Sequence, residues 1–351
     1  MKIAQVAPLT ESVPPRLYGG TERVVAFLTD ELVRNGHDVT LFASGDSQTS
    51  GRLAPMWPHA LRLGMCQDSL ALHLLMLEQV AQRVREFDVI HFHISSFHLS
   101  LARRLPVAHV TTLHGRLDIP ELRPLYREFR DVPVVSISDA QREPLPEAGW
   151  ISTVHHGLPL DLFRLQPTPG DYLAFVGRIS PEKRVDRAIA IATACHRRLR
   201  IAAKVDPADR EYFDREIRPL LDNPLVEYVG EINEAQKQDF FGGAAALLFP
   251  IDWPEPFGLV MIEAMACGTP VVAFRGGSVI EVIDDGVTGF IVDSIDEAIA
   301  ATCRAGELDR KTCRATFERR FDVTRMAREY VALYEKLARV RASGQILTEA
   351  V

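Results

Sequence analysis

Apolar and polar residues alternate along the first half of the chain in runs that predict strands and helices. Apolar runs of strand length are MKIAQVAP, HDVTLFASGD, DVIHFHIS, AHVTTLHG and VPVVSISDAQ. Between them, three segments place apolar residues at helical spacing, namely TERVVAFLTDELVRNG, LHLLMLEQVAQRVREF and LARRL, and Thr21 is expected to cap the first of these. Strands that alternate with helices predict a parallel sheet with helices on both faces.

A second series of the same kind begins at DYLAFVGRIS and ends at GFIVD. We therefore expect an N-terminal domain of residues 1–160, a linker at 161–170 that includes LQPTPG, and a C-terminal domain of residues 171–320. A final amphipathic helix at 321–341 is expected to pack back toward the N-terminal domain. The last residues, SGQILTEAV, are expected to be disordered.

Composition narrows the class of protein. The 351 residues are 47% hydrophobic and 25% charged, so the chain can bury two large cores and is neither disordered nor collagen-like. A net charge of −7 argues against a nucleic-acid partner, because neutralising phosphates needs a basic surface. Five scattered cysteines without a CxxC pair favour reduced thiols over disulfides or a zinc site. With neither a signal peptide nor a membrane span in the sequence, we expect a cytoplasmic protein.

The turn after the first predicted strand contains adjacent glycines, Gly19 and Gly20, where the first helix begins. Glycines let a backbone approach a ligand closely, and a helix N-terminus favours an anion. A plain turn is the alternative interpretation. No GxGxxG follows the strand, which lowers support for hydride transfer. Nearby, His91, His93 and His98 lack a neighbouring cysteine, so core or cleft histidines are favoured over zinc ligands.

Charged residues in the second half sit where strands turn into helices. Arg178 directly follows a strand and Lys183 lies at the start of the next helix, where a cation opposes the helix dipole unless an anion is bound. The alternative is a solvated charge cluster with Glu182 as partner. A later helix offers free amides at its start, at Phe257, Gly258 and Leu259. Together these groups could cradle a diphosphate without metal, and the chain has no Asp-x-Asp pair to hold a divalent ion.

Glu263 is the single charged residue in LVMIEAMAC, residues 259–267, which is otherwise apolar on every side of a helix. A carboxylate is almost never fully buried without a partner. The pattern therefore predicts a partner for Glu263, either a ligand or a salt bridge to a nearby arginine.

Five motifs together resemble glycosyltransferase family 4. They are YGGTE, TTLHG, GRISPEK, the Glu255 and Glu263 pair with seven residues between, and GTPVVAFRGGSVIEVIDDGVTGFIV. The resemblance covers nearly the whole chain and is weakest at residues 46–86 and at the C-terminus. It implies an α/β fold of the GT-B type, with two facing Rossmann-like domains, parallel sheets and an inter-domain cleft. It also implies transfer with retention of anomeric configuration.

The resemblance also implies roles for single residues. Glu263 would bind the ribose hydroxyls of a nucleotide sugar, and Glu255 would lie near the donor sugar. Arg178 and Lys183 would hold the two phosphates, assisted by the Gly19 to Gly20 loop and by the amides of Phe257, Gly258 and Leu259. His114, in TTLHG, would contact the donor sugar's hydroxyls or the reacting centre. Ile232 would place its backbone against the base. Arg184 stands where many relatives carry glycine, which could alter this loop or add a phosphate contact.

On this basis we expect a retaining, metal-independent transferase that needs no cofactor beyond its nucleotide-sugar co-substrate. UDP-sugar is favoured as donor and GDP-sugar comes next. The acceptor would be a hydroxyl of an oligosaccharide or of a natural-product precursor such as an antibiotic, with no nucleic acid and no strong membrane association. A nucleotide-sugar epimerase and a non-catalytic nucleotide-sugar sensor are the alternatives. The Glu255 and Glu263 pair disfavours the first, and His114 disfavours the second.

Overall fold

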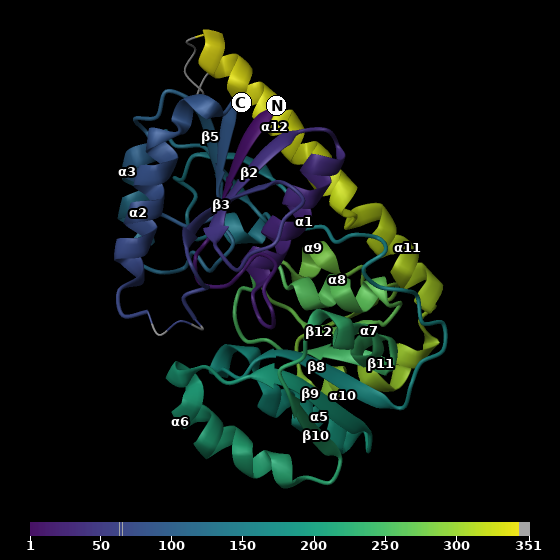
Figure 1. Cartoon of the computed structure of the whole chain (residues 1–351). Coiled ribbons are helices and arrows are strands. Elements are labelled where there is room, and N and C mark those ends of the chain that lie inside the picture. Colours follow the sequence, from purple (N-terminus) through teal and green to yellow (C-terminus); the bar gives the residue numbers. More distant parts are fainter. Residues whose placement is uncertain (63, 65, 344–351) are drawn as a thin grey trace. The chain divides into compact units, whose positions relative to one another are not determined.

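The computed structural model describes residues 1–62, 64 and 66–343 (Figure 1). Two compact units make up the chain. Unit 1 comprises Met1–Gly157 and Val323–Val351, and unit 2 comprises Leu158–Asp322. Residues 344–351, most of the expected disordered tail, lie outside the described residues.

Unit 1 is built on a parallel seven-stranded sheet in the order β3-β2-β1-β4-β5-β6-β7. Its strands are β1 (Lys2–Val6), β2 (Asp38–Ser44), β3 (Arg52–Trp57), β4 (Val89–Phe92), β5 (Ala108–Thr112), β6 (Val134–Ser136) and β7 (Trp150–Thr153). The order runs outward in one direction from β1 and in the other from β4. Sequence patterning did not anticipate β3 and β7, the two edge strands, because Pro55 interrupts the apolar run of β3 and β7 has only two apolar residues, Trp150 and Ile151.

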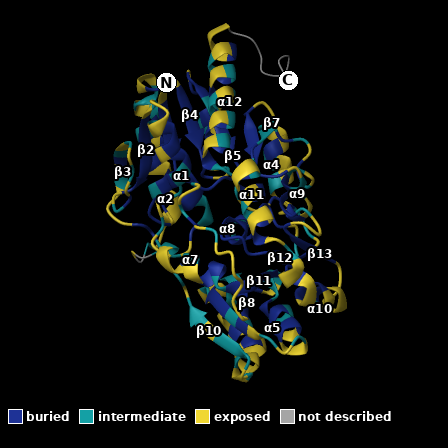
Figure 2. Cartoon of the chain, turned by 90° about the vertical axis from the view of Figure 1, so that its right-hand side faces the viewer, coloured by how far each residue is buried: buried dark blue, intermediate teal, exposed yellow. Residues whose placement is uncertain are grey.

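The helices of unit 1 are α1 (Gly20–Arg34), α2 (Ser69–Gln82), α3 (Leu99–Ala102), α4 (Leu122–Glu128) and the C-terminal α12 (Val323–Ser343). Helix α1 starts one residue before Thr21, and its N-cap is Gly19 with no side-chain cap, so the expected threonine cap is wrong. Helix α12 contacts α1 and β5. Its buried residues recur at helical spacing, and Figure 2 shows exposed and half-buried positions between them along the helix.

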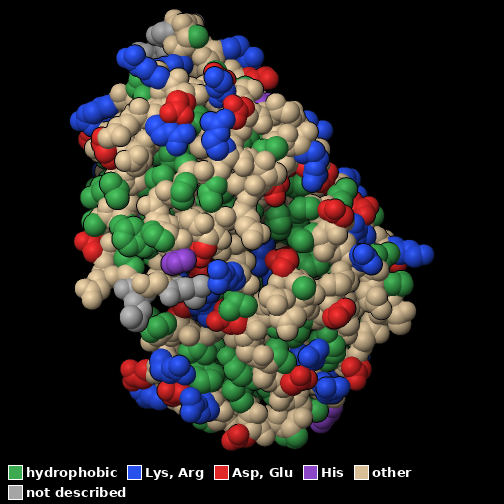
Figure 3. All heavy atoms as spheres, viewed as in Figure 1, with side chains coloured by type: hydrophobic (Ala, Val, Ile, Leu, Met, Phe, Trp, Pro, Cys, Tyr) green, Lys and Arg blue, Asp and Glu red, His purple; other side chains and the backbone are tan. Residues whose placement is uncertain are grey.

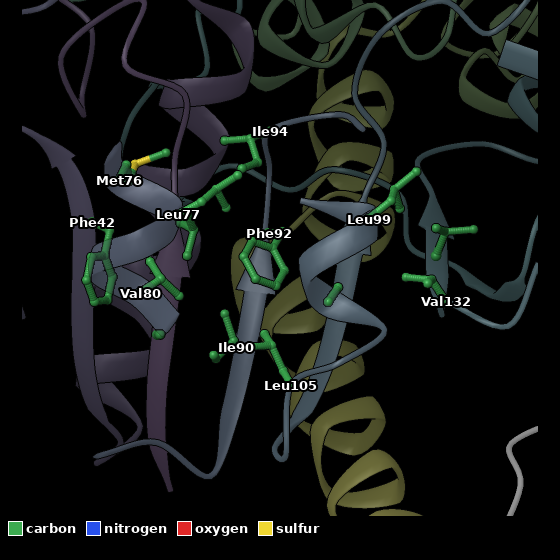
Figure 4. Packing of buried hydrophobic residues seen from close by; sticks show 14 of the residues in the cluster. Phe42, Met76, Leu77, Val80, Ile90, Phe92, Ile94, Leu99, Leu105 and Val132 are labelled. Carbon is green, nitrogen blue, oxygen red and sulfur yellow. The ribbon is translucent and has the colours of Figure 1, made fainter. Parts of the chain in front are cut away.

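The main core of unit 1 lies between the sheet and the helices α2 and α3 (Figure 4). Phe92 of β4 is fully buried among apolar side chains from both helices, including Leu77 and Leu99. The outer face of α2 is different, because Leu70, Leu74 and Leu75 are exposed there and hydrophobic side chains gather on this side in Figure 3. Among the described residues, no helix is both long enough and apolar enough to cross a membrane.

Unit 2 has a parallel six-stranded sheet in the order β10-β9-β8-β11-β12-β13. The strands are β8 (Tyr172–Arg178), β9 (Arg198–Lys204), β10 (Val226–Gly230), β11 (Ala244–Phe249), β12 (Val271–Phe274) and β13 (Gly289–Val292). The α-helices are α5 (Val185–Ala194), α6 (Arg210–Tyr212), α7 (Glu234–Gly242), α8 (Leu259–Ala266), α9 (Val279–Val282), α10 (Ile295–Arg304) and α11 (Arg310–Arg320).

Residues 161–170, expected as a linker, are hydrogen-bonded into unit 2. The amide of Gln166 donates to the carbonyl of Cys267 at 3.0 Å, and Arg310 Nε donates to the carbonyl of Gln166 at 2.6 Å. Gly170 lies so close to Gly243 that a Cβ at position 170 would stand 1.8 Å from the Gly243 carbonyl oxygen. This segment is therefore part of the folded unit that ends at Asp322.

Arg184 adopts the left-handed conformation that favours glycine, with φ 52° and ψ 50° at the N-cap of α5. Its guanidinium binds the carboxylates of Asp186 and Asp252, each at 2.8 Å. The loop thus keeps a left-handed backbone, and the side chain is held by acids on either side of it.

We expect Arg184→Gly to be more stable than Arg184→Ala by about 1 kcal/mol, because both variants lose the same ion pairs and only alanine carries the left-handed penalty. Urea unfolding monitored by circular dichroism measures the difference. The same two substitutions at Arg339, exposed on α12, should give the opposite order by about the same amount, since alanine is the better helix former. Equal stability of the two position-184 variants would contradict the backbone argument.

Candidate active site

In each unit the strand order reverses at one point, which opens a crevice at the carboxyl edge of the sheet. In unit 2 the reversal lies between β8 and β11. The loop after β8 carries Lys183, and the loop after β11 carries Glu255. The sequence-predicted residues therefore lie where an open parallel sheet binds its ligand.

Lys183 and Glu255 are in direct contact at this point. Lys183 Nζ donates a hydrogen bond to Glu255 Oε2, and Trp253 Nε1 donates to the same oxygen at 3.0 Å. The Lys183 ammonium also lies 4.8 Å from the centroid of the Trp253 ring, within cation–π range. The side chains of Lys183 and Glu255 are only 16% and 10% exposed, so their ion pair is shielded from water. Sequence reasoning missed Trp253, although a tryptophan two residues before Glu255 in a predicted binding loop was a usable signal.

Arg178, at the end of β8, is surrounded by acids. It forms ion pairs with Glu182, with Asp206 at 3.8 Å and with Asp209 at 3.4 Å. The ion pair with Glu182 is the one expected under the alternative interpretation, a charge cluster in which Glu182 is the partner. A phosphate here would have to replace these carboxylates as partners of the guanidinium.

Helix α8 begins beside this crevice, directly after the β11 loop. Gly258 is its N-cap with φ 77°, and a Cβ there would lie 2.8 Å from Met261 Cε and 3.0 Å from Phe249 Cζ. The carbonyl of Phe257 accepts from Ser278 Oγ at 2.8 Å, which fixes the loop from the other side. In the first turn the amide of Met261 donates to the carbonyl of Gly258 at 3.0 Å, whereas helix geometry gives the amides of Leu259 and Val260 no acceptor within the helix.

Glu263 faces Lys237. Its side chain is fully buried, and its Oε1 accepts a hydrogen bond from Lys237 Nζ at 2.6 Å. Lys237 comes from α7, and its own side chain is 6% exposed. A salt bridge to an arginine was the alternative to a ligand as the partner of Glu263, and the structure has a salt bridge to a lysine in its place. The sequence signal was weak, because Lys237 lies in a polar segment whose buried face is not obvious.

The remaining predicted contacts lie at helix starts and strand ends. Ile232 is half-buried in the turn after β10 and precedes α7. Gly19 and Gly20 start α1 in unit 1, after the loop that follows β1. A Cβ at Gly19 would lie 2.7 Å from Pro15 Cβ, so packing within the loop is itself a reason for glycine there.

In unit 1 the strand order reverses between β1 and β4, and histidines gather at this point. His91 belongs to β4, His93 follows it, and His114 lies two residues after β5. His93 Nδ1 and His114 Nε2 are 2.8 Å apart, and the His114 ring stacks on His156 with centroids 5.3 Å apart. Among the described residues, no group of three or more His, Cys, Asp or Glu is arranged to hold a metal ion.

Burial keeps these imidazoles neutral. It lowers the pKa of His98 and of His114 to about 3, and it also lowers the pKa values of His91, His93 and His156. His98 stacks on Phe92 and shares a hydrogen bond of 2.6 Å with Thr111 Oγ1. Because an unfolded histidine binds a proton near its ordinary pKa of 6.5 and these folded ones do not, stability must fall as pH drops below that value.

We expect His98 to contribute about 2 kcal/mol to the loss of unfolding free energy between pH 7 and pH 5, since each pKa unit corresponds to about 1.4 kcal/mol. Urea unfolding of the wild type and of His98→Phe at both pH values measures this, and the variant should lose about 2 kcal/mol less. His59→Phe, at an exposed position, is the control and should leave the pH dependence unchanged. The same pH dependence in all three proteins would contradict the argument.

Comparisons with known proteins agree with this architecture. A family model described as Glycosyl transferases group 1 matches residues 164–319. Among curated relatives, D-inositol 3-phosphate glycosyltransferase 2 of Catenulispora acidiphila is 35% identical over 190 residues, which cover 46% of this chain and 43% of that enzyme. Phosphatidyl-myo-inositol mannosyltransferase of Mycobacterium leprae is 25% identical over 99% of this chain and 100% of its own length.

Solved structures match nearly the whole chain. AviGT4, a glycosyltransferase involved in avilamycin A biosynthesis, has a TM-score of 0.74 at 26% identity and covers 96% of this chain and 98% of its own. Anabaena Alr3699/HepE, solved in complex with UDP and glucose, has a TM-score of 0.77 at 20% identity over 96% of this chain and 100% of its own. With two Rossmann-like units on parallel sheets, the fold is GT-B. The model of Glycosyltransferase Family 4 matches residues 18–211, more than half of the chain, and the protein therefore belongs to this family.

Proposed function

We propose that the protein transfers a sugar from a nucleoside diphosphate sugar to a hydroxyl of a carbohydrate or small-molecule acceptor, with retention and without a metal ion. The observation that carries this proposal is the contact of Lys183 with Glu255 at the β8 to β11 reversal, beside the start of α8. It joins a cation, a carboxylate and free amides, which are the groups needed to bind a sugar diphosphate. UDP-sugar is the favoured donor, because the structure of HepE holds UDP.

The diphosphate would bind through charge that the protein already supplies. Lys183 and the amides at Gly258 and Leu259 would contact phosphate oxygens, and the dipole of α8 would favour the anion. Arg178 would contribute by exchanging its carboxylate partners for phosphate. These positive groups stabilise the charge that grows on the leaving oxygen, which is the task a metal ion performs in other transferases.

The nucleoside would be recognised by Glu263. The ammonium of Lys237 stabilises the negative charge of this buried carboxylate, and a carboxylate can accept hydrogen bonds from two ribose hydroxyls. The backbone at Ile232 would contact the base. In unit 1, His114 would bind a sugar hydroxyl, and the Gly19 to Gly20 loop would approach a phosphate.

Retention would follow from attack of the acceptor on the face from which the diphosphate leaves. Glu255 already accepts hydrogen bonds from Lys183 and Trp253 and would contact the donor sugar. A phosphate oxygen would take the proton of the acceptor hydroxyl as the bond to the anomeric carbon breaks. This route needs no enzymic nucleophile.

We expect UDP to bind in EDTA and Lys183→Ala to weaken this binding by a factor of ten or more, because a hydrogen bond to a charged group contributes about 1.5 kcal/mol or more. Calorimetric titration with UDP, GDP and ADP measures affinity and base preference. Lys311→Ala removes the same charge from an exposed position on α11 and should bind UDP like the wild type. Equal weakening in both variants, or loss of binding in EDTA alone, would contradict the proposed phosphate site.

An α-configured UDP-sugar should give an α-linked product, which proton NMR of the anomeric signal detects directly. A β-linked product would exclude retention. With donor alone, we expect slow hydrolysis and no change at other sugar carbons. Conversion to another sugar would instead indicate an epimerase, and no turnover with any acceptor would indicate a nucleotide-sugar sensor.

A further inference from the structure

A continuous chain of hydrogen bonds runs through the core of unit 1 to His114. It passes through the hydroxyl of Tyr334 on α12, which is 2.7 Å from His91 Nδ1 and 3.2 Å from Gln5 Nε2. Gln5 Oε1 is 2.7 Å from His93 Nε2, and His93 Nδ1 is 2.8 Å from His114 Nε2. Gln5 and Tyr334 are fully buried and His93 nearly so, hence water does not compete for these contacts.

The orientation of the Gln5 side-chain amide defines the direction of the chain. Its nitrogen faces the Tyr334 hydroxyl at 3.2 Å and donates there, because an amide nitrogen can only donate. The amide oxygen then faces His93. Because an amide oxygen can only accept, the proton between the two residues belongs to His93 Nε2.

The proton on His93 Nε2 determines which atom donates in the hydrogen bond between His93 and His114. A neutral imidazole carries one proton, so His93 Nδ1 is bare and must accept. The group facing it, His114 Nε2, must therefore carry a proton and donate. His114 is neutral as well, because burial lowers its pKa to about 3. Its second nitrogen, Nδ1, is consequently bare.

His114 Nδ1 is a buried atom with no hydrogen-bond partner among the described residues. An acceptor left in this state is costly unless a ligand or a water molecule supplies a donor. The stacked ring of His156 fixes the plane of the imidazole and hence the direction of this lone pair.

We propose that Gln5 and His93 are positioning residues that hold His114 as the Nε2-protonated tautomer, so that its Nδ1 accepts a hydrogen bond from a sugar hydroxyl. The inference rests on the proposed function and narrows it. A bare Nδ1 has no proton to give, so His114 recognises a hydroxyl and does not act as an acid on the leaving group. His114 touches the substrate, and the other two residues act through it.

Nitrogen-15 NMR of the full chain with labelled histidine, at pH 7.5, measures the tautomer directly. The His114 signals are identified as those missing from His114→Phe. We expect a protonated Nε2 and a bare Nδ1 in the wild type. A proton on Nδ1 would overturn the proposal whether or not the protein binds a nucleotide sugar.

Two variants of His93 separate tautomer control from simple packing. In His93→Asn the amide oxygen can take the place of Nδ1 as acceptor, and His114 should keep its proton on Nε2. In His93→Leu the acceptor is lost, and His114 should show a mixture of both tautomers. An unmixed Nε2 tautomer in the leucine variant would show that His93 does not control His114.

Fluorinated donors test the direction of the bond to the ligand, since fluorine cannot donate a hydrogen bond. We expect one of the four monodeoxyfluoro analogues of UDP-glucose to bind the wild type at least fivefold more weakly than UDP-glucose does. In His114→Phe this difference should vanish. A difference that persists in the variant would overturn the acceptor role. Failure of UDP-glucose to bind at all would contradict the expected donor, and the NMR measurement alone would then decide the inference.

Discussion

Parallel pairing brings the carboxyl ends of all strands in a sheet to one edge, and the candidate site residues in the loops after the strands depend on that constraint. In unit 2 the loops after β8 and β11, on either side of the reversal, bring Lys183 into contact with Glu255. In unit 1 Gln5 lies within β1 and His93 directly follows β4, and the pairing of these two strands at the reversal brings their side chains together. Each sheet thus has polar groups beside the point where its strand order reverses, which is where an open parallel sheet binds a ligand.

The ion pairs of unit 2 support a role in binding rather than in stability. A buried ion pair seldom stabilises a fold more than apolar residues of the same volume would, although removing one partner is costly. The pair of Lys237 with Glu263 is almost completely buried, and that of Lys183 with Glu255 nearly so. Both pairs join neighbouring elements at the candidate site. Because such pairs add little stability, we infer that these charges bind a ligand.

Sequence patterning predicted the two parallel-sheet units and most central strands, because buried strands are continuous apolar runs. It failed at the edge strands β3 and β7, which are half-exposed, because a proline inside β3 argues against a strand and β7 is half polar. It located Glu263 as a buried carboxylate but not its partner, since pairing between α7 and α8 is set by tertiary packing. It interpreted His93 as a core or cleft histidine without a specific role, because no spacing of residues encodes the direction of a hydrogen bond.

Unit 1 is built from two segments of the chain that are separated by the whole of unit 2, and this has a consequence for biosynthesis. Tyr330 and Tyr334 of α12 supply hydroxyls to Thr112 and to Gln5, residues made more than two hundred positions earlier. All of unit 2 is synthesised in between. On the ribosome, the polar centre of unit 1 must therefore wait with unmet hydrogen bonds while unit 2 emerges. Its final arrangement is reached only when the last helix leaves the exit tunnel.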